Sequence, residues 1–218
     1  YKDKFESVAI AEPMLGEVGD DATVINDDKA AVAQAITDEA VKEAGYDSME
    51  AAAEDGTAFV FMGHGTSHTA NVTYDQMQTQ MENLGFTNAF IGTVEGEPED
   101  TACDEVINKV KDAGFKKVIL RPLMVVAGDH ANNDMAGDDD DSWKSQFNAS
   151  GAFDSVDCQI AGLGRIEAVE DLYVEHTKAA IDSLGTADTA EETTDDTAEA
   201  ADDTTDGAEE VTDDSAAE

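Results

Sequence analysis

Two histidines follow short apolar runs, at positions where a metal ion could be bound. His64 lies in a glycine-flanked turn after the run at 58–62, and His130 lies in a polar loop after the run at 117–126. If these runs are parallel strands of one sheet, their carboxyl ends share an edge, which is where ligands bind in such folds. Neutral imidazole is the commonest protein ligand for divalent transition metals. The pattern therefore favours one metal ion held by both histidines with positions left open for a substrate, and ordinary hydrogen-bonded loop histidines are the alternative.

The other histidines are weaker candidates. His68 lies four residues after His64 and is expected to have a surface or supporting role, unless a helix begins there and makes it a further ligand. His176 falls in an amphipathic segment, and we expect it to be exposed to solvent. The turn around His64 matches neither a P-loop nor a GxGxxG motif, and Ser67 lacks the GxSxG context of a hydrolase nucleophile. A hydrolase is therefore disfavoured.

Four consecutive aspartates occupy 138–141, directly before Ser142. Their spacing lacks the central glycine and terminal glutamate of an EF-hand loop. Carboxylates also favour the start of a helix, and a helix is expected over 142–147. We therefore predict a solvated loop that caps this helix, in preference to a calcium site.

Apolar runs that alternate with amphipathic segments are typical of βα units around a parallel sheet. Strands are expected at 7–11, 58–62, 89–94, 117–126 and 155–161. Helices are expected at 28–44, 74–84, 104–113, 142–147 and 167–184, because glycines stop several of them and Asp or Ser residues start them. The predicted organisation is a first segment at 1–27, a crossover helix and linker at 28–56, a four-stranded α/β domain at 57–185, and a tail at 186–218.

The chain has 218 residues and a formal net charge of −39, from 51 acidic and 12 basic residues. A surface of this charge repels nucleic acid phosphates and anionic lipids, so neither is expected as a partner. No apolar run approaches the length of a membrane-spanning helix. Cys103 and Cys158 do not form a CxxC pair, which fits a reducing compartment and predicts a cytoplasmic protein.

The tail at 186–218 contains 14 acidic residues and no Lys, Arg or aromatic residue. Such a segment cannot bury enough apolar surface to fold, so we predict that it is disordered. Its Asp, Thr and Ala composition resembles the spacers of wall-associated proteins. An extracytoplasmic protein is therefore the alternative location, and it would require a signal peptide before the sequence given.

Several motifs together resemble a known family. They are Val60-Phe61-Met62-Gly63-His64-Gly65, Gly92-Thr93-Val94-Glu95-Gly96, the block from Pro122 to Asp139, Asp141-Ser142-Trp143-Lys144 and Gly162-Leu163-Gly164. The chain is similar over about 5–184 to the sirohydrochlorin cobaltochelatases of anaerobic cobalamin synthesis, within the class II chelatases. The block from Pro122 to Lys144 is the most specific part of this resemblance.

The resemblance implies a fold of two similar α/β domains, of which 57–185 would be the C-terminal one and 1–27 the end of the first. It also implies that His64 and His130 are the metal-binding and catalytic residues and that Co²⁺, as the substrate metal, is inserted into sirohydrochlorin. No organic cofactor is indicated, and a homo-oligomer is left open. The family's active-site glutamate, from its first domain, has no matching position here. Candidate substrate-binding residues are Thr66, Ser67, Glu95, Asp129, Arg121, Lys144 and Arg165.

Two alternatives stay open. The same fold could insert Fe²⁺ or Ni²⁺, because imidazole and carboxylate ligands do not by themselves distinguish divalent ions. A non-catalytic carrier of a metal or a tetrapyrrole is the other alternative.

Overall fold

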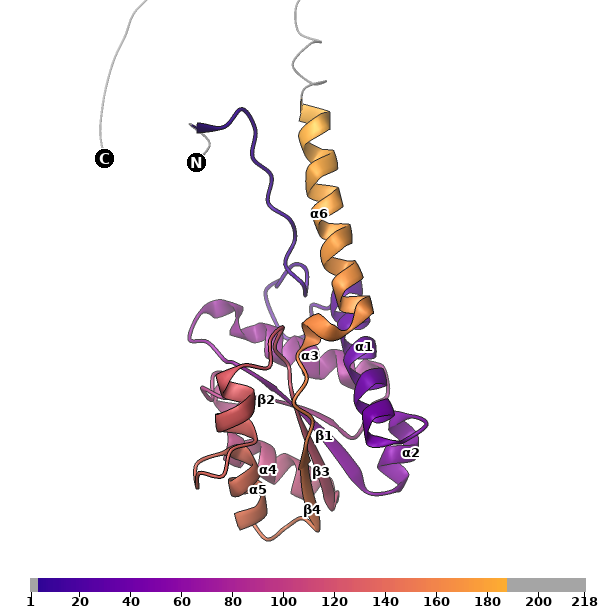
Figure 1. The fold of residues 1–218 in the computed structure, drawn as a ribbon, viewed down its shortest axis with the longest axis vertical. Coiled ribbons are helices and arrows are strands. Elements are labelled where there is room, and N and C mark those ends of the chain that lie inside the picture. The colour runs from indigo at the N-terminus through magenta and orange to yellow at the C-terminus, as the bar shows by residue number, and fades with distance from the viewer. Residues whose placement is uncertain (1–3, 188–218) are drawn as a thin grey trace, which may run out of the picture.

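The computed structural model describes residues 4–187 and contains one sheet of four parallel strands in the order β2-β1-β3-β4 (Figure 1). β1 lies centrally and pairs with β2 on one side and β3 on the other, so that Gly63 pairs with Thr93 and Met62 with Pro122. The predicted α/β class and parallel sheet are confirmed. The strands are β1 (Thr57–Gly63), β2 (Ala89–Thr93), β3 (Lys117–Pro122) and β4 (Ser155–Cys158).

Helices connect the strands and cover both faces of the sheet (Figure 1). They are α1 (Asp27–Ala44), α2 (Met49–Glu54), α3 (Val72–Asn83), α4 (Cys103–Asp112), α5 (Trp143–Ala149) and α6 (Glu167–Ala187), with short 3₁₀ turns at Thr69–Asn71, Glu99–Thr101 and Leu163–Arg165 and a π-helix at His130–Met135. Within residues 4–187, no helix combines the length and the apolar character needed to cross a membrane.

Local signals explain where these helices begin and end. The Asn26 side chain accepts a hydrogen bond from the Lys29 N–H at the start of α1, and the helix ends at Gly45 in the left-handed conformation. The Ser142 hydroxyl accepts a hydrogen bond from the Ser145 N–H at the start of α5. The aspartates at 138–141 are exposed before this cap, as the sequence predicts.

The alternation of side chains along the strands produces a buried apolar layer on each face. Phe59 and Phe61 of β1 pack against α1, α2, α3 and the beginning of α6. Val60 and Met62 point the other way and pack with α4, α5 and Met135 of the π-helix. Because both faces are covered, β1 is buried along its whole length and its end is held firmly in place.

The predicted strand at 7–11 is wrong. This segment is irregular, and Ile10 is 91% exposed. It lies beside α6 in the upper part of Figure 1, and the His176 ring on α6 donates a hydrogen bond to the Glu12 carbonyl at 3.1 Å. Strand residues need hydrogen-bonded neighbours, and the sheet described here provides none for this segment.

Other differences from the sequence-based expectations are smaller. The predicted linker contains α2, whose first turn is capped by Ser48. β3 ends at Pro122 and β4 at Cys158, earlier than expected, and residues 123–128 form an irregular segment after β3. Most of the predicted acidic tail lies outside the described residues, although α6 continues to Ala187. The division into domains stays a prediction.

Candidate metal centre

His64 and His130 meet at the carboxyl edge of the sheet. His64 directly follows β1, and His130 begins the π-helix that follows β3, the strand beside β1. Their ring centroids lie 4.7 Å apart, with an angle of 84° between the ring planes. Both side chains are open to solvent in part, so a ligand can reach them. Two imidazoles at this distance can bind the same ion after small rotations of their rings.

The contacts of the two rings indicate which nitrogen of each is free. His64 Nδ1 lies 2.9 Å from the Gly65 carbonyl oxygen, and His130 Nδ1 lies 2.5 Å from Asp134 Oδ2. A carbonyl and a carboxylate accept hydrogen bonds, so each Nδ1 must carry the proton that is donated. In the neutral rings, each Nε2 therefore keeps its lone pair. In each ring, Nε2 is thus the nitrogen that is left available to bind a cation.

The backbone fixes the turn that carries His64. Gly65 has φ +92°, a conformation that side-chain-bearing residues rarely adopt. The His64 carbonyl accepts a hydrogen bond from the Glu95 N–H at 2.9 Å, and the Gly63 carbonyl accepts one from the Val94 N–H at 3.0 Å. The Tyr74 hydroxyl of α3 accepts a hydrogen bond from the Gly65 N–H at 2.9 Å. These contacts limit how far the His64 backbone can move.

His130 is placed by a π-helix whose inner side is buried. Ala131 and Met135 are fully buried, and Met135 belongs to the core beneath α4 and α5. Asn133 Nδ2 donates a hydrogen bond to Asp129 Oδ1 at 2.6 Å, which links the residue before the π-helix to a residue within it. His130 and Asp134 are left on the accessible side. Isolated π-helical turns are frequent at functional sites.

Of four predicted substrate-binding residues, three lie next to the histidines in the chain and the fourth, Glu95, borders the His64 turn in space. Thr66 and Ser67 continue the turn after His64, with Thr66 half-buried and Ser67 exposed. Glu95 is exposed and borders the same turn, because its Cβ would lie 3.0 Å from a Cβ built on Gly65. Asp129 precedes His130, but its carboxylate already accepts the hydrogen bond from Asn133. Their roles in substrate binding stay predictions.

Arg121 lies elsewhere and is not a surface residue. Its side chain is 1% exposed, and Nη1 donates to Glu43 Oε2 and to Gln159 Oε1, each at 2.7 Å. Arg121 pairs with Phe61 in the sheet, and the contact with Glu43 places its side chain on the α1 face. The structure therefore gives Arg121 a place in the core, bound to Glu43 and Gln159, which provides no support for a role in substrate binding.

Lys144, His68 and His176 have polar partners other than the histidine pair. Lys144 Nζ lies 3.9 Å from Asp138 Oδ1 on the α5 side. His68 Nδ1 accepts a hydrogen bond from the Ala70 N–H at 3.0 Å and so caps the short 3₁₀ turn, which agrees with a supporting role. His176 is only 13% exposed and lies 3.2 Å from Asp28 Oδ1, so the expectation that it is solvent-exposed is wrong.

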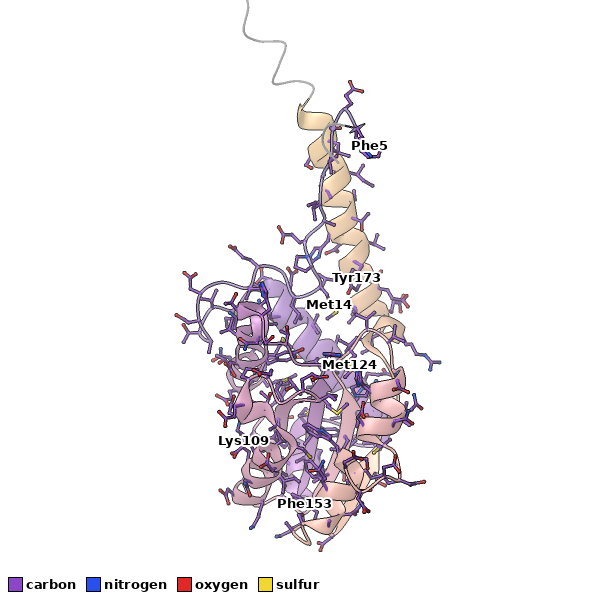
Figure 2. All side chains as sticks on the ribbon, turned by 90° about the vertical axis from the view of Figure 1, so that its left-hand side faces the viewer. Phe5, Met14, Lys109, Met124, Phe153 and Tyr173 are labelled. Atoms are coloured by element: carbon purple, nitrogen blue, oxygen red, sulfur yellow. The ribbon has the colours of Figure 1, made fainter. Side chains whose placement is uncertain are left out.

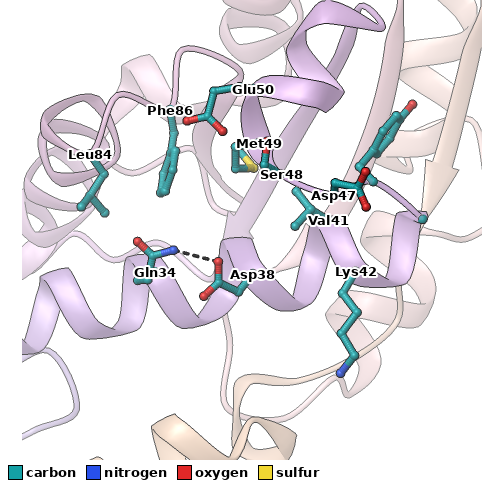
Figure 3. A pocket seen from close by; sticks show the side chains of 12 residues that line it. Gln34, Asp38, Val41, Lys42, Asp47, Ser48, Met49, Glu50, Leu84 and Phe86 are labelled. Carbon is teal, nitrogen blue, oxygen red and sulfur yellow. Dashed lines mark hydrogen bonds between the residues drawn. The ribbon is translucent and has the colours of Figure 1, made fainter.

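An apolar cavity of about 400 Å³ lies beyond the carboxyl ends of β3 and β4. Arg165 contributes the charged side chain of its lining, next to the segment at 125–127 that leads to His130. A larger hollow of about 810 Å³ opens between α1 and α2 (Figure 3). Asp38 and Glu50 line it, and Gln34 donates a hydrogen bond to Asp38 at 2.7 Å. No histidine lines this larger hollow. The smaller cavity is therefore better placed to hold a substrate near His130.

His64 and His130 are the candidate ligands of this site, and the described part of the chain brings no third candidate close to them. Within residues 4–187, no group of three or more His, Cys, Asp or Glu side chains is close enough to hold an ion. Burial raises the pKa of the Cys103 thiol to about 12 and that of Cys158 to about 11, so both thiols stay protonated at neutral pH. An ion at His64 and His130 therefore keeps open positions for a substrate.

Asp134 and Tyr74 were not singled out from the sequence. The spacing of four residues between His130 and Asp134 is the signal that could have identified the first, because side chains at i and i+4 of a helix lie together. The contact of Tyr74 with the His64 turn has no comparable signal in the sequence.

Known proteins give an independent comparison. A family model described as Cobalt chelatase (CbiK) matches residues 1–182. A sirohydrochlorin cobaltochelatase from Salmonella typhimurium is 44% identical over 122 residues, which cover 56% of this chain and 44% of that protein. Sirohydrochlorin cobaltochelatase CbiKC from Nitratidesulfovibrio vulgaris is 36% identical over 129 residues, which cover 58% of this chain and 43% of that protein. The matched part thus spans less than half the length of either relative. The family model covers most of the sequence, and the chain belongs to the CbiK cobalt chelatase family.

Proposed function

We propose that the protein inserts Co²⁺ into sirohydrochlorin, as a sirohydrochlorin cobaltochelatase of anaerobic cobalamin synthesis. The observation that carries this proposal is the pair of imidazoles at 4.7 Å, each with Nδ1 turned toward an oxygen acceptor. The names of the two relatives support both the metal and the macrocycle.

The chemistry follows from these contacts. Co²⁺, as substrate, binds Nε2 of His64 and His130 and keeps its other positions for water and then for pyrrole nitrogens. Two pyrrole N–H protons must leave as the metal enters the ring. A histidine that has released the metal can accept one proton, and a carboxylate beside the turn, such as Glu95, can accept or relay the other. The balance is one metal ion taken up for two protons released.

Binding the macrocycle requires local cations on an acidic protein. Sirohydrochlorin carries many carboxylates, which the net charge of −39 repels at a distance. Arg165 lines the apolar cavity of about 400 Å³ near the His130 segment, so one carboxylate of a bound macrocycle can pair with its guanidinium. Thr66 and Ser67 offer hydroxyl donors on the His64 side. We propose these three as contacts to the substrate.

A carrier that holds a metal or tetrapyrrole without inserting is the second candidate. The same pair of histidines supports this candidate, because two imidazoles can bind a metal ion whether or not it is then inserted into a macrocycle. A chelatase of the same fold that inserts Fe²⁺ or Ni²⁺ is the other alternative. It differs from a cobaltochelatase in which metal ion supports insertion. A cytoplasmic location is proposed on the basis of the free thiols of Cys103 and Cys158.

The decisive test follows sirohydrochlorin by visible absorbance under anaerobic conditions after addition of Co²⁺, Fe²⁺ or Ni²⁺. We expect cobalt-dependent spectral change with the wild type and its loss in His64→Ala and His130→Ala, with both variants folded. His68→Ala is the matched control, because His68 is also a histidine of this turn but contacts Ala70. Cobalt binding without insertion in the wild type would support the carrier, and insertion by either variant at near wild-type rate would remove that histidine from the mechanism.

A further inference from the structure

Asp134 contacts only one of the two histidines. Its Oδ2 lies 2.5 Å from His130 Nδ1, whereas His64 Nδ1 meets the carbonyl oxygen of Gly65. In residues 4–187, His130 is the one polar partner of the Asp134 side chain. The two imidazoles are therefore supported by different groups, one by a charged carboxylate and the other by a neutral carbonyl.

The position of Asp134 is fixed by its neighbours in the chain. Ala131 and Met135 of the same π-helix are fully buried, so the accessible side of this helix cannot rotate. A Cβ built on Gly137 would lie 2.3 Å from the Asn133 carbonyl oxygen, which shows how closely the chain returns after the π-helix. The Asp134 side chain is 44% exposed, and it contributes little to the core. A residue so placed, with so little burial, is not needed to hold the fold together.

We propose that Asp134 is a positioning residue that acts through His130. It holds the proton on Nδ1, directs the Nε2 lone pair toward the ion, and makes His130 the stronger electron donor of the pair, as carboxylates behind metal-bound histidines do. His64, whose Nδ1 meets a neutral carbonyl, is then the weaker ligand and the one from which the ion departs first toward the macrocycle. This inference rests on the proposed function for the identity of the metal ion. The predicted tautomer of the His130 ring does not depend on the proposed function.

The first readout is the tautomer of His130 in the metal-free protein. Long-range ¹H–¹⁵N NMR correlations of the ring distinguish a proton on Nδ1 from one on Nε2, and single histidine substitutions assign the four rings. We expect the Nδ1–H form in the wild type. Asp134→Ala removes the acceptor, so the ring should shift toward the Nε2–H form, while Asp134→Glu should restore part of the Nδ1–H population.

The second readout is Co²⁺ affinity, measured by titration of the full chain with Co²⁺ and followed by its visible absorption. Loss of the group behind a metal-bound histidine costs about 10–100-fold in affinity, so Asp134→Ala and Asp134→Asn should fall in that range. Asp140→Asn is the matched control, because it removes the same charge from an exposed aspartate nearby that contacts neither histidine. It should change affinity by less than about twofold. Circular dichroism verifies that each variant is folded.

The outcomes separate the two proposals. If His130→Ala loses cobalt binding but Asp134→Ala keeps both the tautomer and the affinity of the wild type, the positioning role is wrong and the proposed function stands. If His130→Ala binds cobalt normally, the proposed function fails, and the NMR readout still decides whether Asp134 sets the ring. An equal loss in Asp140→Asn would assign the effect to net charge and overturn the positioning role.

Discussion

The ring of Tyr74 packs so closely against Gly63 that a Cβ built on that glycine would lie 2.4 Å from Tyr74 Cε1. The hydroxyl of the same side chain accepts the hydrogen bond from the Gly65 N–H at 2.9 Å. Tyr74 of α3 thus contacts both glycines that flank His64. The position of His64, the proposed metal ligand at the end of β1, therefore depends on a contact with helix α3.

Gly63→Ala tests the close approach. The added methyl group must push the Tyr74 ring aside, and such overpacking costs about 1–3 kcal/mol of unfolding free energy. The His64 turn should move with the ring, so Co²⁺ affinity should fall as well. Urea denaturation and cobalt titration measure the two effects. Gly128→Ala is the control, because no atom lies within 4 Å of a Cβ built there, and an equal loss of stability in the control would contradict the packing argument.

Tyr74→Phe tests the hydrogen bond separately, because the ring and its packing are kept. The variant leaves the Gly65 N–H without its acceptor, which should lower the unfolding free energy by about 1 kcal/mol. We expect a few-fold weaker binding of Co²⁺, since the His64 backbone becomes more mobile. Wild-type affinity combined with the expected loss of stability would show that Tyr74 supports the fold of the turn without positioning the ligand.

The sheet and the histidine pair were predictable because they depend on short-range patterns. Apolar runs of strand length ended at glycines or polar loops, and the carboxyl ends of adjacent parallel strands must share an edge. His64 and His130 meet for that reason. The contact between His130 and Asp134 was harder to predict, because their spacing of four residues indicates a contact only if the segment is helical, and nothing in the sequence at 130–135 marks the π-helix.

Arg121 and the segment at 7–11 show what the sequence could not reveal. A strand buried on both faces is apolar throughout, so the pattern around Arg121 gives no sign of which face it occupies, and only the contacts with Glu43 and Gln159 settle that. The segment at 7–11 has the composition of a strand, but a strand also requires a partner, and partners depend on the whole fold.

His176→Ala is expected to matter more than an exposed position would suggest. Its Nδ1 lies 3.1 Å from the Glu12 carbonyl oxygen and its Nε2 lies 3.2 Å from Asp28 Oδ1. Both partners are acceptors, so the ring makes both bonds only when both nitrogens carry protons. In this way it joins α6, α1 and the segment before residue 13, part of which is seen beside α6 in Figure 2, where Phe5 and Tyr173 are labelled.

Loss of this ring should lower the unfolding free energy by about 1–2 kcal/mol, which is the range for hydrogen bonds that involve a charged group. It should also speed cleavage of the segment at 4–13 in limited proteolysis, while Co²⁺ affinity stays at the wild-type value. His68→Ala is the comparison, since it removes a histidine that joins no distant segments. Equal proteolysis of the two variants would argue against the link.

The last prediction concerns pH. Lys117 Nζ donates to Asp55 Oδ2 at 2.7 Å, and the Tyr46 hydroxyl donates to the same oxygen at 2.5 Å. The hydrogen bond from Lys117, followed by that from Tyr46, lowers the pKa of Asp55 below its ordinary value of 3.8. The hydrogen bond to Asp55 raises the pKa of Lys117 above its ordinary value of 10.5.

A lowered carboxyl pKa stabilises the folded protein above the unfolded pKa, and this contribution is lost as pH falls through the folded pKa. A raised amine pKa stabilises below the unfolded pKa and is lost as pH rises through the folded one. Asp55→Asn should therefore be less stable than the wild type by a roughly constant amount between about pH 5 and 10, with the difference shrinking below about pH 4. Because Lys117 and Asp55 are both partly exposed, high salt should reduce the difference. Urea denaturation across this pH range measures it, and a difference that persists unchanged at pH 2 would show that the variant acts through packing rather than through charge.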